Sequence, residues 1–400
     1  MKTVQAEVND IQKRNKIKVR VFYRNYKKIH SFYDTLKSHP PLNIEYSFPQ
    51  PNKKYTYLLP IYRKFGNIPL VKKFATLFQK YFFERNKDDS FDLYHYAQMI
   101  PQKVPQKPFV IDFEHVSLLA GFEEKMDAKH LLGVLSHPNC KAIMAWSYAA
   151  VESLKLFLNK DYAQIETKVS VVYPALLLKD YIKSDHEIDY SIMDSNNFNI
   201  LSVGIPYKKK GIIELVEAFK QLVTDKMDLH LYVISDLPAK IVNKYKAVKN
   251  LHIFKPTWSR EDIVTKFFYP ANLFVLPTKG DTFGMVFLEA MLTSTPVITT
   301  KQFAMNEIID DGKTGYLIDS KMTFFSNGII PSWKHINNVL NSGLDEKIVK
   351  QLVEKVERLY RDKELCSQMQ VNALKKVESS FGLKERNSKL YKIYQLALNG

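Results

Sequence analysis

The sequence has few of the residues and segments that mark secreted or membrane-spanning chains. Only two of its 400 residues are cysteines, Cys140 and Cys366. Two cysteines cannot build a disulfide framework, so we expect a reducing compartment. No run of about 18 apolar residues occurs, and the amino-terminal segment lacks an apolar signal core. We therefore expect a cytoplasmic protein, or one peripheral to the cytoplasmic face of a membrane.

Motifs for metal binding are also missing. The chain contains no His-Glu-x-x-His, paired Cys-x-x-Cys or Asp-x-Asp segment. We expect neither a metal nor another cofactor.

Negative charge is scarce relative to positive charge. The chain has 58 Lys and Arg against 42 Asp and Glu, a net charge of +16, and the excess is concentrated in the amino-terminal half. Such a field attracts anionic lipid, nucleic acid or anionic substrates. Residues 55–85 interleave aromatic with basic side chains. They suit either a helix lying in a bilayer interface or a core helix with snorkelling lysines.

The length predicts two domains, and the apolar pattern predicts parallel sheets. Hydrophobic residues make up 46% of the chain, enough for two cores in domains of about 170 to 200 residues each. In the carboxyl half, short apolar strands alternate with helical spacing, which favours right-handed crossovers and ligands at the carboxyl ends of the strands. The expected strands are residues 198–203, 229–234, 251–254, 273–276 and 297–300 there, and residues 16–23, 109–113, 141–145 and 168–172 in the amino half.

The most informative segment follows the expected strand at 273–276. Asp281 and Glu289 stand eight positions apart, with a turn at Lys279-Gly280 before them and a helix expected to begin at Phe283 or Gly284. A helix start presents free N–H groups and a positive dipole end, which suit a phosphate. Acid pairs in isolation are usually solvated charges. In this setting, one carboxylate could hold sugar hydroxyls and the other a ribose.

With its flanking motifs, this segment resembles the donor site of retaining, GT-B-fold glycosyltransferases of family 4, the group 1 type. The flanking motifs are Leu201-Ser202-Val203-Gly204, Lys210-Gly211, Pro296-Val297-Ile298 and the run from Asn306 to Gly315. The resemblance implies an α/β fold of two Rossmann-like domains whose parallel sheets face a central cleft. It implies an acceptor-binding domain at residues 1–178, a donor-binding domain at 196–382 and a terminal helix at 383–400 that crosses back.

The resemblance also implies roles for individual residues. Lys210 matches the diphosphate lysine, Glu289 the ribose ligand and Asp281 the catalytic acid, which is Glu in the family. His115 would hydrogen-bond near the reacting sugar carbon as the second catalytic residue, with His95 as its competitor. The remaining donor-binding positions are Gly204, Lys209 and the backbone N–H groups of Phe283, Gly284 and Met285. Where the family has Arg after the glycine, this chain has Ile205, and Lys208 or Lys209 is expected to replace it.

The implied activity is that of a hexosyltransferase. It would transfer a hexose-type sugar, with retention, from a UDP- or GDP-sugar to a glycan or lipid-linked acceptor, and it would need no metal. If the basic amino-terminal half binds an anionic membrane surface, the reaction would take place there. Nucleic acid is not the expected partner. The alternative is a catalytically decayed scaffold that binds anionic lipid or nucleic acid. Saturable donor binding or slow donor hydrolysis would distinguish the enzyme from the scaffold.

Overall fold

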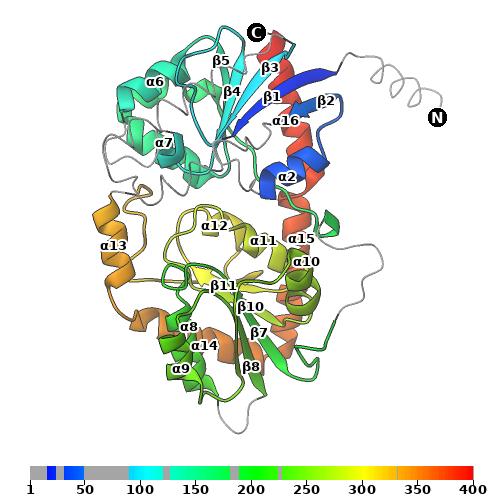
Figure 1. Ribbon diagram of the computed structural model, residues 1–400, viewed down its shortest axis with the longest axis vertical. Helices are drawn as coiled ribbons and strands as arrows, with labels where there is room; N and C mark the ends of the chain where they lie inside the picture. The colour runs from blue at the N-terminus through cyan, green and yellow to red at the C-terminus, as the bar shows by residue number, and fades with distance from the viewer. Residues whose placement is uncertain are drawn as a thin grey trace, which may run out of the picture. The chain divides into compact units, whose positions relative to one another are not determined.

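Two six-stranded parallel sheets form the framework of the chain (Figure 1). The structure is a computed structural model that describes residues 16–23, 31–48, 90–119, 127–180, 189–223, 228–330 and 332–399. The chain divides into two compact units. Unit 1 comprises residues 1–146, 157–172 and 387–400, and unit 2 comprises residues 147–156 and 173–386. The domain limits expected from sequence stay a prediction, and the expected helix at 55–85 lies outside the described residues.

Unit 1 is built on a sheet with the strand order β2-β1-β3-β4-β5-β6. Its central strands β3 and β4 are buried along their whole length, as expected for a parallel sheet covered on both faces. The strands are β1 (Ile17–Tyr23), β2 (Ile44–Ser47), β3 (Leu93–Ala97), β4 (Phe109–Phe113), β5 (Cys140–Ala145) and β6 (Val169–Val171). The α-helices are α2 (Ser31–Ser38), α5 (Val116–Leu119), α6 (Ala128–Ser136) and α7 (Tyr148–Leu158), whose first nine residues belong to unit 2.

A buried polar network joins this sheet to the terminal helix α16 (Leu383–Asn399). The Nε2 atom of His95 lies 2.7 Å from Asp112 Oδ2, and its Nδ1 atom lies 2.9 Å from the hydroxyl of Tyr394. The other oxygen of Asp112 accepts a hydrogen bond from Tyr33 at 2.5 Å. All four side chains are buried, so the network satisfies polar groups that would otherwise be costly inside the core. His95 therefore holds α16 in place.

Unit 2 is built on a second sheet with the order β12-β11-β10-β7-β8-β9. Its strands are β7 (Phe198–Val203), β8 (Leu229–Ile234), β9 (Leu251–Phe254), β10 (Leu273–Leu276), β11 (Val297–Thr300) and β12 (Gly315–Ile318). The five strands expected from sequence in this half have the predicted bounds. Both sheets are those of a Rossmann-like unit, which confirms the predicted GT-B fold class.

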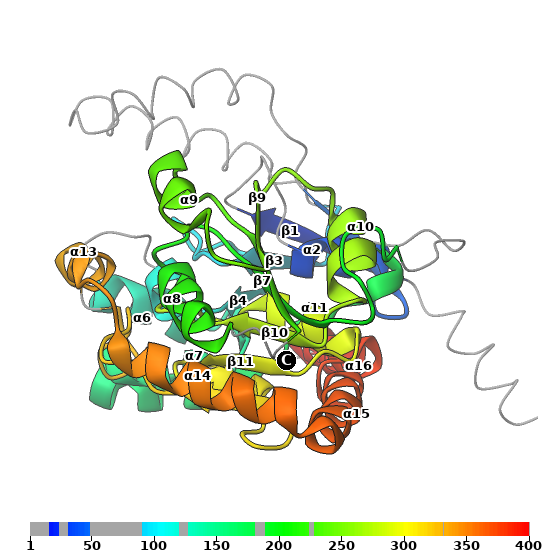
Figure 2. The same ribbon diagram turned by 90° about the horizontal axis from the view of Figure 1, so that it is seen from below.

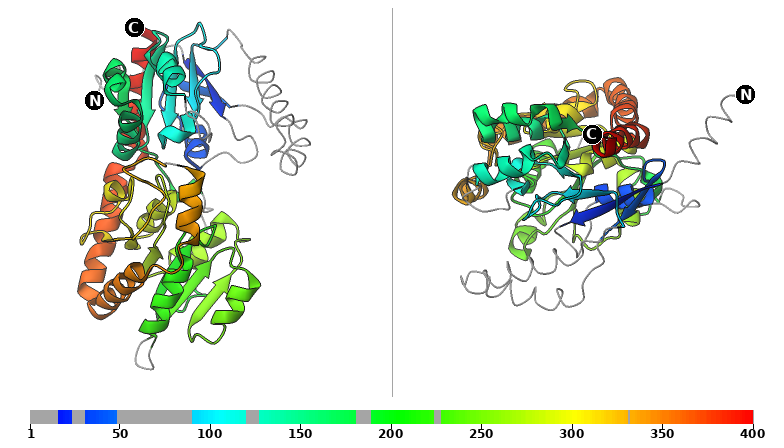
Figure 3. Two further views of the ribbon diagram at one scale, coloured as in Figure 1. Left: turned by 90° about the vertical axis from the view of Figure 1, so that its left-hand side faces the viewer. Right: turned by 90° about the horizontal axis from the view of Figure 1, so that it is seen from above.

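Helices cover the second sheet. They are α8 (Ile212–Leu222), α9 (Ala239–Tyr245), α10 (Arg260–Ile263), α11 (Met285–Leu292), α12 (Met305–Ile308), α13 (Trp333–Asn341), α14 (Glu346–Arg361) and α15 (Lys363–Ser380). A π-helical turn (Val264–Phe268) continues α10. Helix α14 packs against α8 and β12 (Figure 2), and α15 packs against α11 (Figure 3). The carboxyl edge of the sheet carries the loops that follow β7, β10 and β11.

Candidate functional site

Two of these loops, after β7 and after β10, are locked together. The N–H group of Lys279 donates to the carbonyl oxygen of Lys209 at 2.7 Å. Gly211 has a φ of +67°, and a Cβ atom there would lie 2.2 Å from the carbonyl oxygen of Pro277. Only glycine fits both the left-handed backbone and this close approach. The Lys-Gly motif of the sequence therefore joins the two loops.

Lys210 and Asp281, one from each loop, form a bidentate ion pair. The Nζ atom of Lys210 lies 2.8 Å from Oδ1 and 2.6 Å from Oδ2 of Asp281. Both side chains are mostly buried, with exposed fractions of 12% and 13%. A Cβ atom at Gly204 would lie 2.9 Å from Cγ of Lys210, so the glycine makes room for this side chain. An ammonium has three N–H groups, and the pair uses two of them.

The electrostatics of the pair keep Asp281 ionised. Burial by itself would raise the pKa of this carboxyl group, but the cations of Lys210 and Lys209 outweigh burial and hold the pKa below its ordinary value. A fixed negative charge therefore lies beside the fixed positive charge of Lys210 at neutral pH.

Helix α11 begins at Met285, with Gly284 as its N-cap, and not at Phe283 or Gly284 as predicted. The reason is the left-handed backbone of Gly284, whose φ is +71°. The side chain of Phe283 is buried, and its ring lies 6.2 Å from that of Tyr173 and 6.0 Å from that of Phe381. These contacts fix the turn ahead of the helix. The first N–H groups of α11 have no partner within the helix, as at any helix start.

Glu289 lies on the second turn of α11 and is 2% exposed. Its Oε1 atom forms an ion pair with Arg260 of α10. Its Oε2 atom is buried and has no hydrogen-bond partner among the described residues. A buried carboxylate oxygen without a partner is costly, so it marks a position where a ligand hydroxyl would be favourable. The side chain of Ser259 caps α10 by accepting a hydrogen bond from the N–H group of Asp262, and Arg260 was not among the residues predicted from sequence.

A second buried ion pair supports the loop after β10. The Nζ atom of Lys279 lies 2.6 Å from Oε1 of Glu214 on α8, and both side chains are almost completely buried. The sequence predicted only a turn at Lys279. Because a buried charge that loses its partner is strongly unfavourable, this pair fixes the backbone just before Asp281.

The other residues of the loop after β7 have separate surroundings. Ile205 is 54% exposed. The Nζ atom of Lys209 lies 5.6 Å from the ring centre of Phe324, and that of Lys208 lies 3.4 Å from Oδ1 of Asn341. Which lysine would take the place of the family's arginine stays a prediction.

His115 belongs to unit 1, at the start of α5. The side chain is buried, and its Nδ1 atom accepts a hydrogen bond from the N–H group of Ser117 at 3.1 Å. The expected contact between His115 and a donor sugar stays a prediction.

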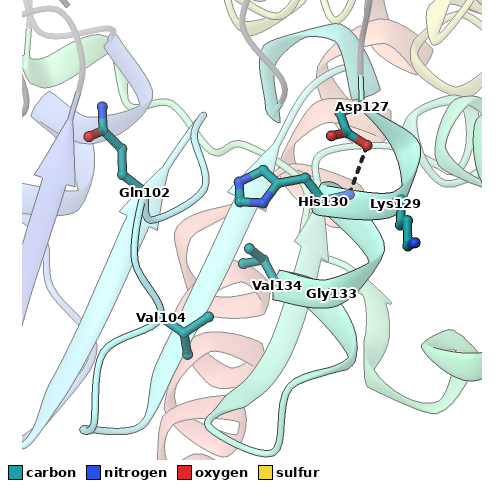
Figure 4. A pocket seen from close by; sticks show the side chains of 7 residues that line it. All are labelled: Gln102, Val104, Asp127, Lys129, His130, Gly133 and Val134. Carbon is teal, nitrogen blue, oxygen red and sulfur yellow. Dashed lines mark hydrogen bonds between the residues drawn. The ribbon is translucent and has the colours of Figure 1, made fainter.

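Unit 1 also contains an open cavity of about 410 Å³ (Figure 4). Gln102 and His130 line it beside the apolar side chain of Val134, and Asp127 caps α6 by accepting from the N–H group of His130 at 3.0 Å. Amide, imidazole and carboxylate groups beside apolar surface are typical of ligand pockets.

Over the described ranges, no three His, Cys, Asp or Glu side chains are grouped to hold a metal ion. Among the helices that the structure describes, none has the length and apolarity to cross a membrane.

Comparison with known proteins shows which protein family and which relatives the chain is similar to. Residues 197–330 match the family model described as Glycosyl transferases group 1. The capsular polysaccharide biosynthesis glycosyltransferase CapM of Staphylococcus aureus is 27% identical over 49% of this chain and 45% of its own length. The N-acetyl-alpha-D-glucosaminyl L-malate synthase of Bacillus anthracis is 30% identical over 40% of this chain and 41% of its own. The matched part thus spans less than half of either relative.

The fold has a solved counterpart in Anabaena Alr3699/HepE, whose structure was determined in complex with UDP-glucose. That structure covers 95% of this chain and 99% of its own, with a TM-score of 0.61 and 13% sequence identity. The two parallel sheets and this likeness show a GT-B fold. Within this chain, residues 197–330 are similar to the group 1 glycosyl transferases.

Proposed function

We propose that the chain is a hexosyltransferase that takes a hexose-type sugar from a UDP- or GDP-sugar and transfers it, with retention, to a glycan or lipid-linked acceptor. One observation carries the proposal: Lys210 and Asp281, from two neighbouring loops, form an ion pair at the sheet edge where α11, the helix that carries Glu289, begins. The names of CapM and of the HepE complex with UDP-glucose support it.

Each group can answer one need of the reaction. The third N–H group of Lys210 and the first N–H groups of α11 would bind the diphosphate and offset the charge that grows on it. The unpartnered Oε2 atom of Glu289 would accept a ribose hydroxyl. Asp281 would accept hydroxyls of the sugar, and His115 would donate near the reacting carbon.

Retention would follow from reaction on one face of the sugar. The bond between the anomeric carbon and the phosphate oxygen breaks, and the bond to the acceptor oxygen forms on the same side. The acceptor proton passes to the departing phosphate oxygen. No metal takes part in this proposal, because the cation of Lys210 and the dipole of α11 supply the positive charge.

The acceptor is proposed to bind unit 1. Its open cavity offers the amide of Gln102 and the imidazole of His130, groups that can hydrogen-bond glycan hydroxyls. If this holds, His130→Ala raises the KM for the acceptor and leaves the affinity for the donor unchanged.

The test of the function is a panel of UDP- and GDP-sugars titrated into the purified chain. Wild type should bind one of them saturably and hydrolyse it slowly, whereas Glu289→Gln should bind it at least about tenfold more weakly. Glu354→Gln, which changes an exposed acid paired with Lys355, is the matched control. Absence of binding to every donor, with salt-sensitive binding of nucleic acid instead, would favour the scaffold alternative.

A further inference from the structure

Phe303 has an unusual backbone for its side chain. It lies in the loop after β11, at the same sheet edge as Asp281, and its φ is +40°. Bulky residues rarely adopt the left-handed region, because the side chain crowds the backbone there. Strain of this kind persists only where neighbours hold it in place, and it concentrates at ligand sites.

One neighbour that packs against Phe303 is a second aromatic ring. The rings of Phe303 and Phe325 are stacked, with centres 4.5 Å apart and planes 18° from parallel. Both side chains are only half-buried. The pair therefore combines a fixed geometry with aromatic side chains that are partly exposed.

The loop of Phe303 is joined to the loop that carries Asp281. The side-chain amide of Gln302 donates to the carbonyl oxygen of Thr278 at 2.7 Å. Next to Phe325, the N–H group of Phe324 donates to the carbonyl oxygen of Lys279 at 2.7 Å. Both aromatic residues are thus anchored to the segment directly before Asp281.

The strand order of the sheet indicates whether Phe303 and Phe325 would contact the nucleoside or the sugar of a bound donor. Glu289, the proposed ribose ligand, pairs with Arg260 of α10, the helix that follows β9 at one end of the sheet. The loop of Phe303 follows β11, on the opposite side of β10 from β7, β8 and β9. A ligand with its nucleoside at Glu289 and its sugar at Asp281 would therefore place the sugar beside the aromatic pair.

We propose that Phe303 and Phe325 form an aromatic wall of the donor-sugar subsite that favours a neutral hexopyranose over a hexuronic acid. A pyranose ring offers an apolar face of C–H groups to an aromatic ring, whereas the negative face of the aromatic ring repels a carboxylate. The strain at Phe303 then has a function, since glycine at this position would relieve it but would remove the wall. This inference rests on the proposed function of the same site.

The experiment compares Phe303→Gly and Phe325→Leu with wild type by calorimetry. The ligands are UDP, GDP, their glucose conjugates and UDP-glucuronic acid. In both variants, the gain in affinity that the glucose adds to the nucleotide should fall about tenfold, the effect of one lost stacking contact. The preference for glucose over glucuronic acid should fall with it, while binding of the free nucleoside diphosphate stays within about twofold.

Phe198→Leu is the matched control, because this half-buried ring packs 5.6 Å from Tyr360 at the amino end of β7, the other edge of the same sheet. It should leave both affinities unchanged. Phe303→Gly should keep the melting temperature of wild type or raise it, because relief of the backbone offsets the lost stack.

The outcomes separate this inference from the proposed function. If the gain in affinity that glucose adds to the nucleotide is unchanged in both variants, the proposed aromatic wall is refuted. Equal losses for free nucleotide and nucleotide sugar also overturn it, because the rings would then only support the loops. If wild type itself binds none of these nucleotides, the proposed function is wrong and the wall is refuted with it.

Discussion

The strongest prediction concerns the ion pair between Lys210 and Asp281. Lys210 gives two of its three N–H groups to this carboxylate. A nucleoside diphosphate bound at the proposed site would therefore lie beside a negative charge and share the ammonium with it. The substitution Asp281→Asn removes that charge and keeps the shape of the side chain. We expect it to tighten the binding of free nucleoside diphosphate and to abolish transfer.

The magnitude follows from the geometry. A unit charge about 5 Å from a phosphate oxygen, at an effective dielectric constant of about 20, repels it by about 3 kcal/mol. Solvent screening at a partly open site leaves about half of this, so free nucleoside diphosphate should bind about tenfold more tightly. The same change leaves the mostly buried Lys210 without its counter-charge, which should lower the free energy of unfolding by about 2 to 4 kcal/mol.

Calorimetry with UDP, GDP and their sugar conjugates measures the first effect, and chemical denaturation measures the second. Added nucleoside diphosphate should restore much of the lost stability, because it supplies the missing negative charge. Asp281→Glu, which keeps the charge, is the control, and it should retain part of the activity. The reasoning fails if Asp281→Asn binds the diphosphate no more tightly than wild type, or if it transfers sugar as fast.

The remaining predictions concern other charged groups of unit 2. His230 and His252 are stacked, with Nδ1 of the first 3.2 Å from Nε2 of the second, and burial lowers the pKa of each. The stabilising effect of these two neutral histidines is therefore complete above the ordinary pKa of 6.5 and is lost as the pH falls below it. The melting temperature of His230→Gln should consequently fall less than that of wild type between neutral and mildly acidic pH. Lys279→Met alone should cost about 3 to 5 kcal/mol in chemical denaturation, and addition of Glu214→Leu should recover most of it. In calorimetry, Glu289→Gln should weaken the binding of ribonucleotides more than the binding of their 2′,3′-dideoxy analogues. An equal loss of affinity for both would contradict a contact between Glu289 and the ribose.

The ion pair of Asp281 should also make wild type and Asp281→Asn differ in stability at acidic pH. Its pKa in the folded chain lies below the ordinary value of 3.8, because Lys210 and Lys209 outweigh the effect of burial. The ion pair therefore contributes in full above that ordinary value, and its contribution is lost as the pH falls through the folded-state pKa. Wild type should lose stability more steeply than Asp281→Asn in that acidic range.

Much of unit 2 could be predicted from the sequence, because its strands are short apolar runs bounded by turns, and most of them are buried on both faces. Such runs keep their pattern whatever the tertiary contacts are. The resemblance implied the terminal helix at 383–400, and the structure has it at Leu383–Asn399. In unit 1, β2 escaped prediction because only one of its four residues is fully buried. Strand β3 escaped because His95 interrupts its apolar pattern, and only the contact with Asp112 makes that histidine a core residue.

The sequence predicted which residues lie near one sheet edge but not the contacts between them, and their roles at a donor site stay a prediction. The motif placed Lys210, Asp281 and Glu289 near one sheet edge, because the carboxyl ends of parallel strands meet there. Lys210 and Asp281 are 71 positions apart in the chain, and no local pattern says that they form an ion pair. Arg260 was missed because a short polar helix gives no sign of which acid it will meet.

The ion pair also bears on how the proposed reaction would end. With Ile205 in place of the family's arginine, Lys210 would be a principal cation for the diphosphate of the proposed site, and Asp281 would compete for it whenever no sugar is bound. Hydroxyls of a bound sugar would draw hydrogen bonds from Asp281 and leave more of the ammonium to the phosphates. Once the sugar has left, Asp281 would return to Lys210 and loosen the diphosphate, a step that often limits turnover. Wild type should therefore bind its nucleotide sugar more tightly than the free nucleotide, and Asp281→Asn should reverse that order.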